Sequence, residues 1–371
     1  MQKNIFLLLL ILSFFSCKKR EINTITNLFS SSEILFHKNL DIQDDLDMIL
    51  TPSALIFENN SLITHNNRSN LIFSLIDLET NKVRKSWGRK GQGPGEIIGI
   101  LDFYKNYNNT GINAWDAMMQ RLNFYSFENI LINDIILPED LFKDTKGIKG
   151  QSFREQFFPN VLQINESVFL AFGSNEKKRF TLIDIKNGEK IGVVDYPKQD
   201  VTDIPLIFKN QAYNGLIRYN KQQNRVAYIS FESEMFEIFS LDNSDLILKY
   251  GNYTTIPKYT FQDKGMGPNI SLEKFSNGYG CYIALSVTDD KIFILYQQYD
   301  KEYLDEKSEK YIEKFFSRSA NKILVFDWDG KPLKLYELDC VVEGIEFDKN
   351  KNRLYAIKSE FDPEIIYFDL P

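Results

Sequence analysis

The chain has 371 residues, with 44 basic and 51 acidic side chains and a formal net charge of −7. Such a mild acidic excess argues against nucleic acid as a partner, because binding to a phosphate backbone needs a basic face. The 30 Phe and 19 Tyr residues favour β-structure, since strands prefer aromatic and β-branched side chains.

The first residues have the pattern of a secretory signal. A basic Lys3 precedes an apolar run from Ile5 to Phe15, and the small Ser16 stands before Cys17. The run is shorter than the roughly 20 apolar residues that span a bilayer. We therefore predict a signal peptide over residues 1–16; an ordinary secreted protein or an uncut membrane anchor are the alternatives.

The Ser16–Cys17 pair resembles the lipobox of bacterial lipoproteins, although Phe14 stands where that motif usually has Leu. The resemblance implies that the Cys17 thiol receives diacylglycerol and becomes the first residue of the mature chain. Acyl chains hold a protein on a membrane by about 0.8 kcal/mol per buried CH₂ group. Residues 17–28 would then form a lipidated tether, and the membrane would be a partner through this lipid.

One pattern returns six times along the rest of the chain: an alternating apolar strand followed by a polar turn. The strands end at Leu78, Phe127, Ile185, Leu241, Trp328 and Leu370, so the steps are 49, 58, 56, 87 and 42 residues. A second short hairpin precedes most of them, as at 54–64, 161–166, 215–221 and 344–350. Two hairpins make a four-stranded propeller blade, and repeats of this length are typical of propellers.

The predicted fold is therefore all-β: a six-bladed β-propeller of four-stranded blades over residues 29–371. The segment 33–40 is expected to supply an N-terminal strand that closes the last blade, because an unclosed ring leaves exposed strand edges. Insertions are predicted near 140–157, 251–276 and 299–319. The last two account for the long fourth step, and long loops in compact domains are often functional.

The most specific motif is Gly-rich and lies at residues 86–96. Gly91, Gly93, Pro94, Gly95 and Glu96 have the form GxGPGE. This stretch resembles the signature of the TolB-like six-bladed β-propeller lipoproteins common in Bacteroidota. The resemblance implies a propeller, a lipid anchor and an envelope location, and it implies no particular activity. Surface-exported lipoproteins of that group tend to carry acidic residues after the Cys, whereas Lys18, Lys19 and Arg20 are basic; we therefore predict the periplasmic face of the outer membrane.

Two interpretations of the Gly-rich loop stay open. Its backbone N–H groups can cradle a ligand, which makes a candidate binding loop of Arg89, Gly91, Gln92, Gly93, Pro94, Gly95 and Glu96. The alternative is a crossover between blades in which Glu96 accepts backbone hydrogen bonds. A weaker copy of the motif occurs at residues 264–269 and would place two such loops on one face.

A second constellation, Trp115 and Asp116 followed by Arg121, resembles a strand pair of NHL-type propellers. There we expect an ion pair between Asp116 and Arg121 across a hairpin, with Trp115 as packing.

Local motifs for catalysis are sparse in this sequence. His37 and His65 are its only histidines, which rules out a zinc site built on several His side chains, and no Gly-x-Ser-x-Gly elbow occurs. A metal held by carboxylates from several blades leaves no local motif; Asp102, Asp116 and Asp289 are arbitrary candidates for it. Cys281 and Cys340 either form a disulfide or remain two free thiols.

These observations favour a non-enzymatic binding or scaffold module in the cell envelope, without a cofactor and with a protein or small-molecule ligand on one propeller face. The alternative is a metal-assisted hydrolase or lactonase with its site in the central channel. A third possibility is a structural lipoprotein of a larger outer-membrane complex.

Overall fold

The computed structural model describes residues 24–43, 52–66, 68–93, 95–128, 131–136, 158–173, 178–198, 200, 206–263, 268–272, 280–298, 320–360 and 362–371. Nearly all of its secondary structure is β-strand, and the helices are the short η1 (Ile25–Leu28) and α2 (Leu206–Ala212). Within these residues, no helix is long and apolar enough to cross a membrane. The predicted signal peptide and Cys17 lie outside the described residues.

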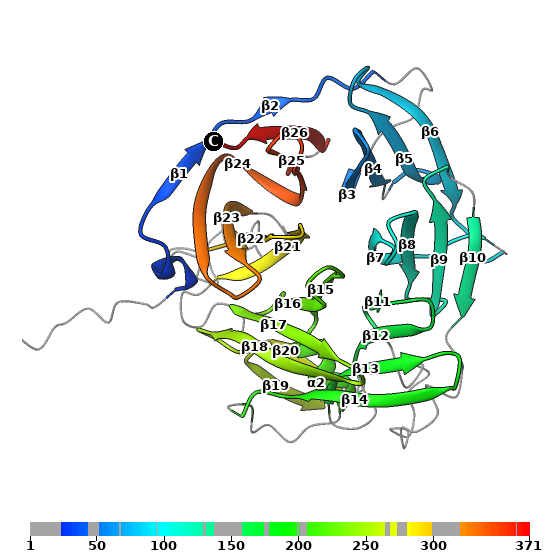
Figure 1. The fold of residues 1–371 in the computed structure, drawn as a ribbon, viewed down its shortest axis with the longest axis vertical. Coiled ribbons are helices and arrows are strands. Elements are labelled where there is room, and N and C mark those ends of the chain that lie inside the picture. The colour runs from blue at the N-terminus through cyan, green and yellow to red at the C-terminus, as the bar shows by residue number, and fades with distance from the viewer. Residues whose placement is uncertain are drawn as a thin grey trace, which may run out of the picture.

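Six antiparallel blades stand in a ring, with the first strand of each nearest the centre (Figure 1). The first blade is β3 (Pro52–Glu58), β4 (Ser61–Asn66), β5 (Leu71–Asp77) and β6 (Lys82–Arg89). The second is β7 (Ile100–Lys105), β8 (Gly111–Asp116), β9 (Arg121–Ser126) and β10 (Leu131–Ile136). The third is β11 (Val161–Gln163), β12 (Val168–Phe172), β13 (Lys178–Asp184) and β14 (Glu189–Asp195), and the fourth is β15 (Gly215–Asn220), β16 (Arg225–Ser230), β17 (Met235–Asp242) and β18 (Asp245–Tyr253). The six-bladed propeller prediction is confirmed.

The fifth and sixth blades share one long strand, β24 (Pro332–Asp348). Its first half completes the fifth blade after β21 (Cys281–Val287), β22 (Lys291–Gln297) and β23 (Ala320–Asp327). Its second half is the inner strand of the sixth blade, beside β25 (Arg353–Lys358) and β26 (Glu364–Asp369). Ala320 pairs with Val342 whereas Lys322 pairs with Glu337, so residues 338–341 bulge out where the strand passes between blades.

The beginning of the chain closes the ring, as predicted. β2 (Lys38–Asn39) pairs antiparallel with β26 and completes the sixth blade. β1 (Ser32–Leu35) runs parallel to β24 and adds a further strand to the fifth blade. Before them, Ile25 is fully buried against the fourth and fifth blades. Thr24 and Ile25, at the end of the expected tether, are therefore buried on the propeller, whereas Leu28 is exposed.

Turn chemistry explains the repeating pattern in the sequence. In several blades the third strand ends in an Asp side chain that accepts hydrogen bonds from the following turn: Asp77 from the Glu79 and Thr80 backbone N–H groups at 2.8 and 2.9 Å, and Asp184 from that of Lys186 at 2.9 Å. Asn59 and Asn60 both have positive φ in the two-residue turn between β3 and β4. Such turns match the twist of a hairpin, and Asn tolerates them better than most residues.

Of the three predicted insertions, residues 140–157 and 299–319 lie outside the described residues. In the remaining insertion, residues 251–276, β18 continues to Tyr253, and a separate hairpin of β19 (Tyr259–Asp263) and β20 (Pro268–Leu272) follows. In the weaker copy of the Gly-rich motif, residues 264–267 also lie outside the described residues.

Candidate functional site

The Gly-rich loop links the outer strand of the first blade to the inner strand of the second. Glu96 accepts a hydrogen bond from the Gly93 N–H at 2.9 Å, and a side chain at Gly91 would collide with the Glu96 carboxylate. The Gly91 N–H donates to Ile97 O at 3.0 Å, and the Ile97 N–H to Arg89 O at 2.9 Å. Glu96 thus holds the loop together from inside, as the crossover interpretation expects; Pro94 lies outside the described residues.

Trp115 is fully buried and donates from Nε1 to Phe158 O at 2.8 Å. Asp116 pairs with Arg121 in the β-ladder, but their charged groups have other partners. The Asp116 carboxylate accepts from the N–H groups of Ile98 (2.8 Å) and Met119 (3.1 Å). Arg121 donates to the Glu96 carbonyl and forms an ion pair with Asp134 at 3.7 Å. Asp116 and Arg121 therefore both anchor the crossover loop, in place of the direct pair expected between them.

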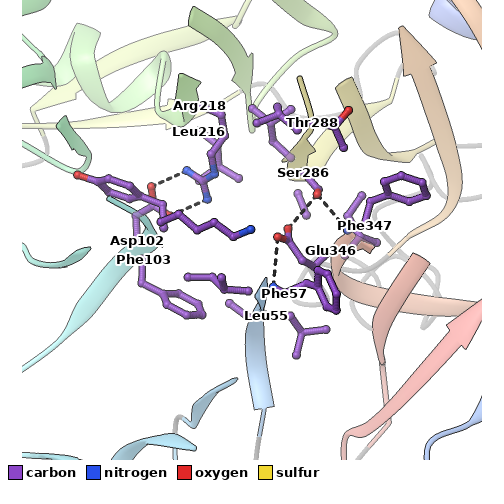
Figure 2. Close-up of a pocket in the computed structure, with 18 of the residues that line it drawn as sticks. Leu55, Phe57, Asp102, Phe103, Leu216, Arg218, Ser286, Thr288, Glu346 and Phe347 are labelled. Carbon is purple, nitrogen blue, oxygen red and sulfur yellow. Dashed lines mark hydrogen bonds and ion pairs between the residues drawn. The ribbon is translucent and has the colours of Figure 1, made fainter. Parts of the chain in front are cut away.

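The inner strands enclose a central cavity of about 900 Å³. Side chains of β3, β7, β11, β15, β21 and the second half of β24 line it, and five blades contribute charged or hydroxyl groups (Figure 2). None of residues 89–96 that the structure describes lines this cavity. β7 runs away from the Gly-rich loop into the cavity wall, so that loop and the cavity are distinct places on the molecule.

Arg218 on β15 and Asp102 on β7 form a two-pronged ion pair in the cavity wall. Nη1 lies 2.8 Å from Oδ2, and Nη2 lies 2.9 Å from Oδ1. Burial would lower the pKa of the Arg218 guanidinium, but the charge and hydrogen bonds of Asp102 outweigh burial and raise it. The Arg218 guanidinium is therefore charged and bonded to Asp102.

Glu346 faces this pair from the other side of the cavity (Figure 2). Its Oε2 accepts from Ser286 Oγ at 2.8 Å, and its Oε1 accepts from the Phe57 N–H at 3.3 Å. Ser286 is in turn fixed by the Phe347 N–H, which donates to its Oγ at 3.2 Å. Burial raises the pKa of Glu346, and the charges of Lys105 and Arg218 only partly offset that rise. Glu346 is thus a half-buried carboxylate facing the cavity, and its hydrogen bonds come from neutral donors.

Two further cavity side chains have their own partners. Lys105 Nζ lies 2.9 Å from Glu58 Oε2, which joins the first and second blades. His65 Nδ1 lies 2.8 Å from Ser53 Oγ. Burial, with a smaller contribution from the Lys90 charge, lowers the pKa of His65 to about 4. The imidazole is therefore neutral at physiological pH.

The carboxylates suggested for a channel metal are not brought together. Asp102 is bound to Arg218, Asp116 anchors the crossover loop, and Asp289 Oδ2 lies 3.0 Å from Lys349 Nζ. Among the residues that the structure describes, no three of the cavity's carboxylates bring ligand atoms within 4.8 Å of one another. Cys281 and Cys340 are both free thiols. Of the two states considered for these cysteines, the structure has the unbonded one.

Sequence reasoning missed Arg218, Ser286 and Glu346. Arg218 and Glu346 lie in runs interpreted only as hairpins, and the segment around Ser286 was not interpreted. A usable signal existed, because a charged side chain interrupts an apolar inner strand at Asp102, Arg218 and Glu346. Which of these charges meet depends on how the blades face the channel, and a single strand does not carry that information.

Comparison with known proteins agrees with this architecture. Residues 33–350 match the model of the TolB-like 6-blade propeller-like family. A solved structure of a DUF4221 family member from Bacteroides vulgatus aligns with a TM-score of 0.52 at 12% identity, covering 91% of this chain and 96% of that one. A solved structure from Bacteroides fragilis, of a protein whose name describes it as exported, aligns with a TM-score of 0.53 at 12% identity. The alignment covers 92% of this chain and 96% of that one. No curated protein matches the sequence. The two structural likenesses show the fold.

Proposed function

Because the chain belongs to the TolB-like six-bladed propeller family, we propose that it is a lipid-anchored envelope protein whose central channel binds a small polar ligand carrying a protonated amine. The observation behind the ligand is Glu346, a half-buried carboxylate facing a cavity of about 900 Å³. Ligand sites generally have volumes of about 300–1,000 Å³ and a few well-placed polar groups on mainly apolar walls.

The charge arrangement selects the ligand class. Asp102 with Arg218 and Glu58 with Lys105 are paired at hydrogen-bond distance, so each pair is close to neutral. Among the described residues, no cation forms an ion pair with Glu346. A buried carboxylate is costly unless a cation or strong donors compensate it. An ammonium group of a ligand would supply that compensation, and Leu55, Phe57 and Leu216 would contact its apolar part.

The anchor rests on the start of the sequence. Ser16–Cys17 after a short apolar run supports lipidation at Cys17, and the name of the Bacteroides fragilis neighbour agrees with export. The basic residues 18–20 support the periplasmic face of the outer membrane. The first residue described as packed on the ring is Thr24, so a short segment would join the lipid to the propeller.

Calorimetric titration of the full chain in detergent tests the channel site. The probes are triglycine, glucosamine and spermidine, each beside its N-acetylated form, which lacks the protonated amine at the modified nitrogen. We expect at least one free amine to bind about 10-fold or more tightly than its acetylated form, since a charged hydrogen bond contributes about 1.5–3 kcal/mol.

The variant Glu346→Gln should remove that preference. Glu343→Gln is the matched control, because Glu343 also lines the cavity but accepts from Ser359 Oγ at 2.8 Å. Absence of binding by all three amines, or an amine preference that survives in Glu346→Gln, would contradict the proposal.

A further inference from the structure

A mixed cluster of metal-ligating side chains lies where the N-terminal strands meet β24. His37, Asp339 and Cys340 each place one ligand atom so that all three atoms lie within 4.8 Å of one another. His37 Nδ1 is 2.9 Å from Asp339 Oδ2, and the His37 backbone N–H donates to Asp339 Oδ1 at 3.2 Å. None of the three residues lines the central cavity, so the cluster is separate from the site above.

The irregular course of β24 brings the two neighbouring residues to one place. In a regular strand, Asp339 and Cys340 would point to opposite faces. Residues 338–341, however, bulge out between the pairings Lys322–Glu337 and Ala320–Val342. Bulges commonly redirect side chains near functional sites. His37 reaches the same point because it connects β1, paired to β24, with β2, paired to β26.

We propose that His37, Asp339 and Cys340 form a binding site for a divalent transition metal, with Zn²⁺ as the best match. Zinc prefers thiolate, imidazole and carboxylate ligands in a tetrahedral arrangement. Three protein ligands leave a fourth position for water or a small anion. On binding, the Cys340 thiol releases its proton to solvent and the metal replaces the hydrogen bond between His37 and Asp339.

The present spacing suits such a site with little rearrangement. Bonds of about 2.0–2.3 Å to a tetrahedral zinc place ligand atoms roughly 3.3–3.8 Å apart. The His37 and Asp339 side chains are 26% and 23% exposed, so they can adjust and a metal can enter. Lys358 is a nearby cation, but its Nζ lies 2.7 Å from Glu360 Oε1, which compensates its charge.

A metal bound at this site would stabilise the closure of the ring. His37 and Asp339 are 302 positions apart in the sequence, and a metal would bond the N-terminal segment directly to β24. β2 pairs with β26 through only Lys38 and Asn39, so a further link at His37 would strengthen a short closure. Zinc should therefore raise the melting temperature of the protein.

Cobalt(II) titration of the reduced full chain in detergent tests the site directly. We expect one cobalt per chain, a thiolate-to-cobalt charge-transfer band, and displacement of cobalt by zinc. Cys340→Ser should abolish the band, whereas Cys281→Ser, the matched cysteine control, should keep it. His37→Gln should weaken binding by more than about 100-fold, because loss of even an outer partner of a ligand costs 10–100-fold.

His37→Gln leaves β24 intact, so it serves as a second variant if Cys340→Ser fails to fold. The melting temperature should rise with zinc in the wild type and stay constant in His37→Gln. A charge-transfer band that is absent from the wild type, or that persists in His37→Gln with unchanged affinity, would overturn the proposal.

Discussion

Arg218 and Asp102 join the fourth blade directly to the second, across the third. Between them stands the inner strand of the third blade, β11, which has only three residues, Val161–Gln163. Other polar contacts join adjacent blades around the channel. Ser286 and Phe57 link the fifth and first blades to Glu346 in the sixth, and Asn220 Nδ2 donates to Asp289 O at 2.9 Å between the fourth and fifth. The charged groups at the centre thus belong to the same contacts that hold the ring together.

Replacing one member of the Arg218–Asp102 pair should destabilise the fold. Asp102→Asn leaves a buried guanidinium without its counter-charge, and breaking a buried pair costs about 3–5 kcal/mol. Urea denaturation measures this loss in the free energy of unfolding. The double variant Asp102→Leu with Arg218→Met, which removes both charges, should be clearly more stable than Asp102→Asn. Equal stability of Asp102→Asn and the wild type would contradict the assigned role.

Glu234 should make the protein less stable as pH rises. Burial raises its pKa to about 7, although hydrogen bonds from Tyr296 and the Ile25 and Gly280 backbones oppose the rise. The folded state therefore binds a proton that the unfolded state has lost between about pH 4.5 and 7. Over that window the free energy of unfolding of the wild type should fall by about 3 kcal/mol relative to Glu234→Gln. Denaturation of both proteins at pH 4 and pH 8 measures this change. Equal changes in the free energy of unfolding of the wild type and of Glu234→Gln would refute the prediction.

His65 should make the protein more stable as pH rises, which is the opposite of the effect of Glu234. Its pKa of about 4 in the folded state lies below the ordinary value of 6.5, so the unfolded state binds the extra proton between these values. Stability should rise with pH over this window, by roughly 3 kcal/mol relative to His65→Asn. The two effects nearly cancel in the wild type, whose stability should change less with pH from 4.5 to 6.5 than that of either variant. A wild-type slope as steep as that of a variant would disagree with these assignments.

The proposed lipid anchor gives a prediction in cells. Cys17→Ser removes the thiol that would carry the lipid, so the protein should move from the membrane fraction to the soluble periplasmic fraction and lose incorporation of labelled palmitate. Cys281→Ser is the control, because that cysteine is buried in the ring. Incorporation of labelled palmitate into Cys17→Ser equal to that of the wild type would exclude Cys17 as the anchor.

Much of the fold could be predicted because its signals are local. The six strands of the repeating pattern are the third strand of each blade, and in several of them a terminal Asp side chain bonds the adjacent turn, as Asp77 does. The closing segment was also recognisable, although its strand in the last blade, β2, has only the two residues Lys38 and Asn39. The shared strand β24 was not predicted, since its crossing between blades depends on a bulge rather than on a turn residue.

The sites were less accessible to sequence reasoning. The composition of the Gly-rich loop made it a candidate binding loop, yet in the structure the Glu96 carboxylate accepts a hydrogen bond from Gly93 of its own loop. Glu346 was interpreted as one residue of a strand, and its importance comes from its place in the channel, where burial raises its pKa and Ser286 and Phe57 donate hydrogen bonds to it. His37, Asp339 and Cys340 meet only because the ring closes. Such contacts arise between distant segments, and no local pattern records them.

A crystal structure of the protein with the amine probe that binds most tightly would test the channel site most directly. We predict electron density in the central cavity, with the probe's nitrogen within hydrogen-bond distance of Glu346 and its apolar part against Leu55 or Leu216. Density over the Gly91–Glu96 loop with an empty cavity would contradict the account.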